Sequence, residues 1–129
     1  MSSRMLADND AWMKLTKVYM MLMVADMGRA VAFYRDAFGL RPTMQTPFWS
    51  ELAFGDAVLA LHGGGSGTGG ETDLGLEVDD LDAACAAVRA HGGQVVREPQ
   101  DRPEEQIRLA TVADTEGNQF SLGQALAAG

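Results

Sequence analysis

The chain has 129 residues, of which 47% are hydrophobic, and a formal net charge of −8 at pH 7 with a pI near 4.5. This length suffices for one domain with a buried core. The acidic balance argues against nucleic acid or an anionic membrane as partner, because both need a cationic face. The single cysteine, Cys85, excludes an internal disulfide, and its alanine-rich surroundings predict a buried side chain. No apolar run approaches a membrane span or a signal peptide, so we expect a soluble cytoplasmic protein.

The first half of the chain is predicted to fold as a strand, a helix and three further strands. Residues 18–24 are continuously apolar, which predicts a strand covered on both faces. Asp26 is placed to cap a helix whose apolar side chains recur at spacings of three and four, and Gly39 is placed to end it. Alternating apolar residues between turn signals predict strands over residues 41–44, 48–54 and 57–62.

The second half is predicted to repeat this order after a glycine-rich segment. Residues 63–70 (GGGSGTGG) lack the Lys-Ser/Thr of a phosphate-binding loop and predict a flexible tether. A strand over residues 74–78 leads to a helix that Asp79 or Asp80 caps and that ends after His91 at two glycines. The remaining strands are predicted over residues 94–97, 107–113 and 119–122, with a polar loop over residues 98–105.

The two halves are also related in sequence. Shifting residues 22–39 by 54 positions places them on residues 76–93. The identical pairs are Leu22/Leu76, Val24/Val78, Asp26/Asp80, Ala30/Ala84, Ala32/Ala86, Arg35/Arg89 and Gly39/Gly93. A repeat of this size predicts two similar units that pack together, so that each unit buries apolar surface that the other cannot bury alone. We therefore expect an N-terminal extension (1–17), a first βαβββ module (18–62), the tether (63–70), a second βαβββ module (71–124) and a tail (125–129).

Three segments carry a family resemblance: LMVADMGRAVAFYRDAFGL, LEVDDLDAACAAVRAHGG and IRLATVADTEGNQFSLGQ. In that order they resemble the vicinal oxygen chelate superfamily, which includes glyoxalase I, extradiol dioxygenases, fosfomycin-modifying enzymes and the bleomycin resistance proteins. The resemblance covers nearly all of residues 18–124. It implies an α+β fold of two βαβββ modules, with curved mixed sheets around a shared cavity and helices outside, and it implies a homodimer. Because such folds carry many functions, the function has to be argued from the site.

In the enzymes of this superfamily, His, Gln or Glu side chains on the first and last strands of the modules hold a divalent metal. The motifs place Tyr19, Ala60, Asp73 and Ser121 at these four points, and the repeat independently relates Tyr19 to Asp73. Only Asp73 is a good ligand, since a neutral phenol or hydroxyl does not hold such an ion against water. The resemblance therefore implies a dismantled metal site, and we expect no metal and no cofactor.

Alternation along the strands predicts which side chains face the cavity. The candidate ligand-binding residues are Tyr19, Met21, Trp49, Glu51, His62, Asp73, Glu77, Leu109 and Ser121. This lining is aromatic and acidic, with no cation except His62, which suits a flat or amphipathic molecule with a positive group. The alternatives are ordinary packing by the methionines and Trp49, a solvated His62 at the rim, and a one-residue slip that turns the glutamates to solvent. A further alternative is an unorthodox metal site formed by His62, Asp73 and Glu77.

Two other side chains have structural interpretations. Arg108 lies opposite the cavity by strand phase, where we expect it to pair with Asp114 or Glu116. His91 stands at the predicted end of the second helix, where an imidazole interacts favourably with the helix dipole. Neither residue is assigned to the site.

The lining and the resemblance together favour a metal-independent protein of the bleomycin-resistance-like branch. It is expected to bind a small aromatic or cationic, antibiotic-like molecule without catalysis, so no catalytic residue is assigned. The alternative is a glyoxalase-like metal-dependent lyase, isomerase or dioxygenase with an atypical site. A third interpretation is a vestigial cavity in a domain that acts through protein partners.

Overall fold

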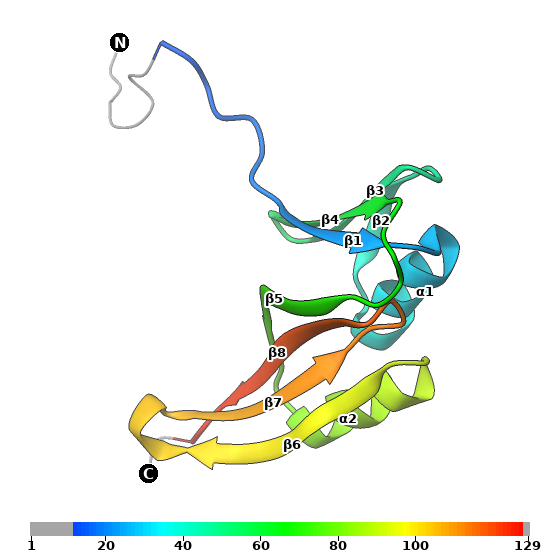
Figure 1. Ribbon diagram of the computed structural model, residues 1–129. Helices are drawn as coiled ribbons and strands as arrows, with labels where there is room; N and C mark the ends of the chain where they lie inside the picture. The colour runs from blue at the N-terminus through cyan, green and yellow to red at the C-terminus, as the bar shows by residue number, and fades with distance from the viewer. Residues whose placement is uncertain (1–11, 128–129) are drawn as a thin grey trace.

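The computed structural model describes residues 12–127 (Figure 1). The elements of the first half are β1 (Met20–Val24), α1 (Met27–Phe38), β2 (Arg41–Gln45), β3 (Trp49–Phe54) and β4 (Ala57–Gly63). Those of the second half are β5 (Gly70–Glu77), α2 (Leu81–Ala90), β6 (Gln94–Arg102), the 3-10 turn η2 (Pro103–Glu105), β7 (Ile107–Ala113) and β8 (Asn118–Ala125). No helix within the described range is long and apolar enough to span a membrane.

The strands form two four-stranded sheets, one from each half, in the orders β1-β4-β3-β2 and β5-β8-β7-β6. Each sheet contains one parallel pair, β1 with β4 and β5 with β8, while its other neighbours are antiparallel. In Figure 1, α1 and α2 lie next to each other on one side of the molecule. The repeat therefore folds twice into the same topology, and the predicted α+β fold of two βαβββ modules with mixed sheets is confirmed.

Helix α1 begins and ends where the sequence predicts. Asp26 Oδ1 accepts a hydrogen bond from the Arg29 backbone N–H at 3.0 Å, the usual contact of an N-cap. Gly39 ends the helix in the left-handed conformation, with φ of 72°, and its N–H donates to the Arg35 carbonyl at 3.0 Å. The buried side of the helix comprises Met27, Ala30, Val31, Phe33 and Tyr34.

Helix α2 is capped by Asp80, which decides between the two predicted aspartates. Its Oδ1 accepts a hydrogen bond from the Ala83 backbone N–H at 3.0 Å, and His91 occupies the C-cap position expected for it. Cys85 is buried, as predicted, and burial raises the pKa of its thiol. The thiol is therefore held in its protonated, unreactive form.

Both modules contribute to one hydrophobic core on the helix side of the sheets. The strand residues that alternate with the candidate ligand residues face this core. On β1, β3, β4 and β8, the large apolar ones exposed by 5% or less are Leu22, Val24, Leu52, Leu59, Leu61, Phe120 and Leu122. The predicted phase of β1, β3, β4 and β8 is therefore confirmed, and a one-residue slip of these strands is excluded.

The prediction of a polar loop over residues 98–105 is wrong. β6 continues to Arg102 and pairs with β7 through Gln100 and Asp101, after which η2 turns the chain. β6 is the outer strand of its sheet and is largely exposed on both faces, so it lacks the apolar alternation that predicts a strand. Pro99 is tolerated because the missing N–H of a proline costs little at a sheet edge, and the register shifts where it stands.

The turn between β7 and β8 fastens the second module to the start of α1. Oε1 of the fully buried Glu116 accepts hydrogen bonds from the backbone N–H groups of Ala25 and Asp26 at 2.8 and 2.9 Å. Oε2 accepts from Arg29 Nε at 2.9 Å and from the Thr115 hydroxyl at 3.0 Å. Burial raises the pKa of Glu116, but the hydrogen bonds from Asp26, Arg29 and Ala25 outweigh it and bring the pKa below its ordinary value. The charged carboxylate is also favoured by its place at a helix N-terminus.

Asp114 forms the second half of this contact. Its Oδ2 accepts hydrogen bonds from the Tyr34 hydroxyl at 2.6 Å and from Asn118 Nδ2 at 3.2 Å. Burial and the neighbouring charge of Asp114 raise the pKa of Tyr34 well above its ordinary value, so the phenol remains a donor. We call Asp114, Glu116 and Asn118 the inter-module clasp, since Asn118 Nδ2 also donates to the Met23 carbonyl at 2.9 Å.

The glycine-rich segment approaches the clasp turn at Gly69. A Cβ added to Gly69, where φ is 57°, would lie 2.0 Å from the Gly117 carbonyl carbon. We expect Gly69→Ala to lower the free energy of unfolding by about 1–3 kcal/mol, because backbone on both sides has to move. Urea denaturation measures this, with Gly28→Ala as control, since a Cβ at Gly28 meets only Asp26 Oδ1 at 3.9 Å. Equal loss in both variants would contradict the steric explanation.

Candidate functional site

The predicted ligand residues lie on the sheet faces that point away from the helices. Two rows cross the first sheet, Met21–Ala60–Glu51 and Met23–His62–Trp49. Tyr19, Met21 and Met23 are 47%, 45% and 42% exposed, whereas Leu22 and Val24, which alternate with the methionines, are in the core. In the single chain this face is open to solvent, so a closed cavity on it requires a second surface.

Four side chains gather around the carboxylate of Glu51 on this face, and together with it we call them the Glu51 cluster: Lys17, Tyr19, Trp49, Glu51 and His62. Lys17 Nζ lies 2.9 and 2.8 Å from the Oε1 and Oε2 atoms of Glu51. Trp49 Nε1 donates to Oε2 of the same carboxylate at 2.8 Å. These hydrogen bonds, first from Lys17 and then from Trp49, hold the pKa of Glu51 below its ordinary value. The carboxylate is therefore charged at neutral pH and fixed in orientation.

The aromatic rings of the cluster meet edge to face. The ring centroids of Tyr19 and Trp49 are 5.5 Å apart, and those of Trp49 and His62 are 5.9 Å apart, with interplanar angles of 89° and 86°. His62 is exposed, in agreement with a solvated residue at the rim, and its Nδ1 lies 2.6 Å from the Gly63 carbonyl oxygen. Lys17 Nζ lies 5.8 Å from the centre of the Tyr19 ring, within range of a cation–π contact. The cluster thus combines ring edges and faces with one oriented carboxylate.

Lys17 corrects the prediction that His62 is the only candidate cation on this face. Its ammonium is bound at the centre of the cluster, so Glu51 is not a free negative charge. A signal for it was present, because Lys17, Tyr19 and Met21 alternate with Val18 and Met20 as one face of a strand does. The predicted strand begins one residue later, at Val18, so Lys17 belongs to the predicted extension, to which no role is assigned.

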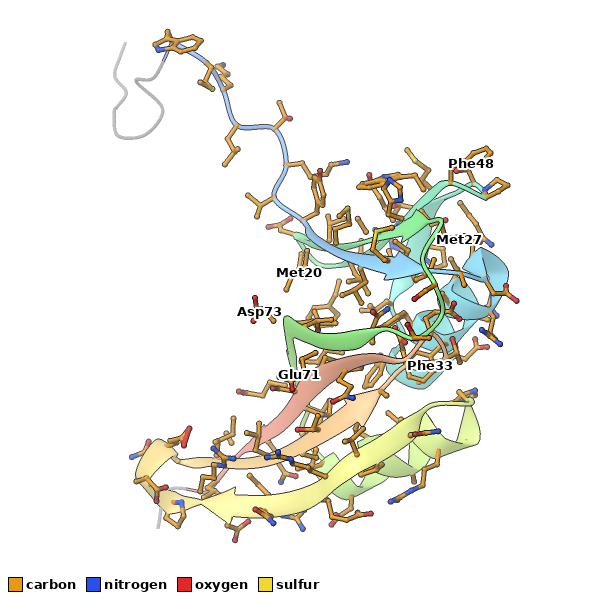
Figure 2. All side chains as sticks on the ribbon, in the orientation of Figure 1. Met20, Met27, Phe33, Phe48, Glu71 and Asp73 are labelled. Atoms are coloured by element: carbon orange, nitrogen blue, oxygen red, sulfur yellow. The ribbon has the colours of Figure 1, made fainter. Side chains whose placement is uncertain are left out.

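The other predicted ligand residues lie on the second sheet. Asp73 and Glu77 belong to β5, Leu109 to β7 and Ser121 to β8. All are exposed except Leu109, which is half-buried. Figure 2 shows Asp73 and Glu71 beside β5, below β1. Within the described residues Asp73 and Glu77 form no ion pair, so their charges are available on this surface.

The four positions at which the family's enzymes would hold a metal do not fit that role here. Ala60 is fully buried and has no donor atom, and Tyr19 and Ser121 offer neutral hydroxyls. Asp73 alone provides a strong ligand, and one carboxylate does not retain a divalent ion against water. The donor set therefore argues against the family's metal chemistry at these positions.

The unorthodox metal site of His62, Asp73 and Glu77 is not formed within one chain. His62 belongs to the first sheet and the two carboxylates to the second. Among residues 12–127, no three His, Cys, Asp or Glu side chains lie close enough together to hold an ion.

Three grooves of the described chain can be compared with the open face. One, of about 440 Å³ and mostly apolar, lies between β1, β4, β5 and the end of α1. The others, of about 700 and 380 Å³, lie at the start of α1 and between β1 and the glycine-rich segment. Of the predicted ligand residues, only Glu77 and Met21 line any of these three grooves. The predicted lining is therefore the open sheet face itself.

Arg108 lies opposite the candidate face, as predicted, but its partners differ from those expected. It pairs with Asp82 of α2 at 3.1 Å and with Asp101 of β6 at 3.4 Å. Asp101 is its direct neighbour across the β6–β7 pairing, a relation hidden by the wrong prediction of a loop there. The expected partners, Asp114 and Glu116, belong to the inter-module clasp.

Comparison with known proteins gives the same fold and a family. The sequence model of the Glyoxalase/Bleomycin resistance protein/Dioxygenase superfamily matches residues 17–122. A lactoylglutathione lyase of Haemophilus influenzae is 30% identical over an alignment of length 116, and the alignment covers 78% of this chain and 85% of that protein.

Solved structures resemble the fold at low sequence identity. A glyoxalase/bleomycin resistance protein/dioxygenase family enzyme of Burkholderia phytofirmans has a TM-score of 0.69 at 20% identity, covering 84% of this chain and 97% of that one. The fosfomycin resistance protein FosX of Mesorhizobium loti also has a TM-score of 0.69, at 19% identity, covering 89% of this chain and 96% of that one. The family match, the repeated topology and these structures agree: the chain belongs to the glyoxalase/bleomycin resistance protein/dioxygenase superfamily.

Proposed function

We propose that the protein binds a small aromatic molecule with a positively charged group, and that it does so without a metal and without catalysis. One observation carries the proposal: the open face of the first sheet carries the Glu51 cluster and that of the second sheet carries the exposed carboxylates of Asp73 and Glu77, while the family's metal positions lack suitable donors. Aromatic side chains stack on flat rings, and the carboxylates attract a cation. The ligand is antibiotic-like in this proposal, and the protein is cytoplasmic.

The proposal includes a homodimer. Tyr19, Met21 and Met23 together expose apolar surface on the open face, and such a patch typically marks an interaction surface. A second copy placed against this face buries the patch and closes a cavity over the Glu51 cluster. Analytical ultracentrifugation is expected to give twice the chain mass of 13.8 kDa. A monomer throughout the micromolar range would contradict this part of the proposal.

A thermal-shift screen against aromatic and cationic antibiotics tests the binding. A ligand at 100 times its Kd stabilises a protein by about 2.7 kcal/mol, which raises Tm by roughly 5–10 °C for a domain of this size. Trp49→Ala is expected to remove most of this shift, because it deletes the central ring and a hydrogen bond to Glu51. Phe48→Ala is the matched control, since Phe48 is 79% exposed and lies outside the cluster. A ligand whose shift survives Trp49→Ala unchanged would place binding elsewhere.

A metal-dependent lyase reaction is the second candidate function. The 30% identity to a lactoylglutathione lyase favours it, and the donor set opposes it. The decisive measurements are the metal content of protein purified without chelator and turnover of lactoylglutathione with and without added divalent ions. We expect substoichiometric metal and no turnover. A tightly held stoichiometric ion or metal-dependent turnover would favour the lyase over the binding protein.

A further inference from the structure

Lys17 reaches the Glu51 cluster from a segment with little other attachment. Residues 14–19 form no helix or strand, and residues 12–19 are all exposed. Figure 1 shows this part of the chain leading away from the two sheets. Within the described residues, the two hydrogen bonds of Lys17 Nζ to Glu51 are the only ones that join residues 12–18 to the rest of the protein.

The Glu51 side chain is held in place more firmly than the Lys17 side chain that contacts it. The Glu51 side chain is 10% exposed, whereas that of Lys17 is 42% exposed. Trp49 Nε1 holds one oxygen of Glu51 from the neighbouring position on β3, so the carboxylate is oriented independently of Lys17. The Tyr19 ring stands edge-on to Trp49 and borders the same ammonium. An oriented carboxylate bordered by aromatic rings is a receptor for a cation, and Lys17 fills it.

We infer that Glu51, Trp49 and Tyr19 form a subsite for the primary ammonium group of the ligand, and that Lys17 occupies this subsite until the ligand displaces it. The inference rests on the proposed binding function and assigns the chemical class of the group that is recognised. It also makes Lys17 a residue that determines specificity, because a ligand has to compete with a tethered ammonium.

The geometry favours a primary ammonium over other cations. A single nitrogen lies 2.9 and 2.8 Å from the two carboxylate oxygens of Glu51, which uses two N–H donors of one compact charge. A quaternary ammonium has no N–H to donate, and a planar guanidinium pairs with a carboxylate through two nitrogens, unlike the single nitrogen that contacts both oxygens of Glu51. The ring 5.8 Å from the nitrogen adds a cation–π contact that an aryl group on the ligand extends by stacking.

Competition by Lys17 is tested with phenethylammonium as the cationic probe and 2-phenylethanol as its neutral counterpart, by calorimetric titration. In Lys17→Ala and Lys17→Met the subsite is vacated, so phenethylammonium is expected to bind about three- to tenfold more tightly than to the wild type. Lys14→Ala is the matched control, because Lys14 is exposed and forms no ion pair with a described residue. It is expected to bind as the wild type does. Glu51→Gln is expected to abolish the preference for phenethylammonium over phenylethanol in every background.

The outcomes separate this inference from the proposed function. Unchanged or weaker phenethylammonium binding in both Lys17 variants, or absence of binding in all of them, overturns the ammonium subsite. If a ligand from the thermal-shift screen still binds and depends on Trp49, the proposed function survives that result. Thermal unfolding of each variant identifies any that does not fold, and the Lys17→Met variant, which keeps an unbranched apolar stem, guards against loss of packing in Lys17→Ala.

Discussion

Replacement of Glu116 by alanine is expected to lower the free energy of unfolding by about 2–4 kcal/mol. The fully buried carboxylate accepts backbone hydrogen bonds from Ala25 and Asp26 and side-chain bonds from Arg29 and Thr115. Its removal leaves two backbone donors at the start of α1 without their partner and takes a negative charge from a helix N-terminus. Urea denaturation, followed by circular dichroism, measures the loss.

The matched control for this variant is Asp82→Ala. Asp82 is also a carboxylate paired with an arginine, Arg108, but its side chain is 75% exposed. We expect a loss of less than about 1 kcal/mol there, as for other exposed ion pairs. Equal losses in Glu116→Ala and Asp82→Ala would show that the inter-module clasp contributes no more than a surface contact.

The clasp also predicts how stability depends on pH. Because the folded state holds the pKa of Glu116 below its ordinary value of 4.5, Glu116 stabilises the fold above that value. This contribution is lost as the pH falls from 4.5 through the lower pKa of the folded protein. The loss of stability over this acidic range is therefore expected to be steeper in the wild type than in Glu116→Gln. Parallel curves for the two proteins would contradict the depressed pKa.

Phe120→Ala is expected to destabilise the protein by about 3–5 kcal/mol. Phe120 belongs to β8 of the second module and is 2% exposed, and its ring centroid lies 6.0 Å from those of both Tyr34 and Phe38 on α1. The truncation therefore leaves a cavity between the modules. Repacking of side chains within one module does not fill it. Phe120→Leu is expected to cost less, because it restores most of the volume.

Unfolding curves separate this effect from a general loss of aromatic surface. Phe54→Ala, at a phenylalanine that is 74% exposed, is expected to change stability by less than about 1 kcal/mol. If Phe120→Ala is no less stable than Phe54→Ala, the aromatic contact does not join the modules. If Phe120→Ala unfolds in two steps, the two modules no longer unfold cooperatively. That result would support the role assigned to Phe120.

Local signals explain why the fold was predictable from sequence. Asp26 and Gly39 act within one turn of α1, so the residues that start and stop the helix are visible in the sequence around them. In β4, Leu59 and Leu61 of the core alternate with Ala60 and His62 of the open face. β1 is apolar throughout, and the prediction that both of its faces are covered is wrong for the single chain, because Met21 and Met23 are 45% and 42% exposed. These signals determine secondary structure and strand phase without any long-range contact.

The features that were missed depend on distant partners. The sequence around Glu116 is that of a polar turn. No nearby residue indicates that its carboxylate accepts hydrogen bonds from the backbone at the start of α1. Lys17 precedes the first regular strand and acquires its role only when Glu51 is placed beside it. β6 has few apolar residues because it is the edge strand of its sheet and is largely exposed to solvent. The residues of the candidate site were recognisable by strand phase, whereas the charge balance between them was not.

The inter-module clasp has a consequence for the order in which the protein matures. Glu116 follows Ala25, Asp26 and Arg29 by 91, 90 and 87 residues. The ribosome has therefore added 87 to 91 further residues before these groups at the start of α1 can bind the carboxylate of Glu116. Until then their backbone donors have to be hydrated, so synthesis of the turn between β7 and β8 is the event that completes the first helix.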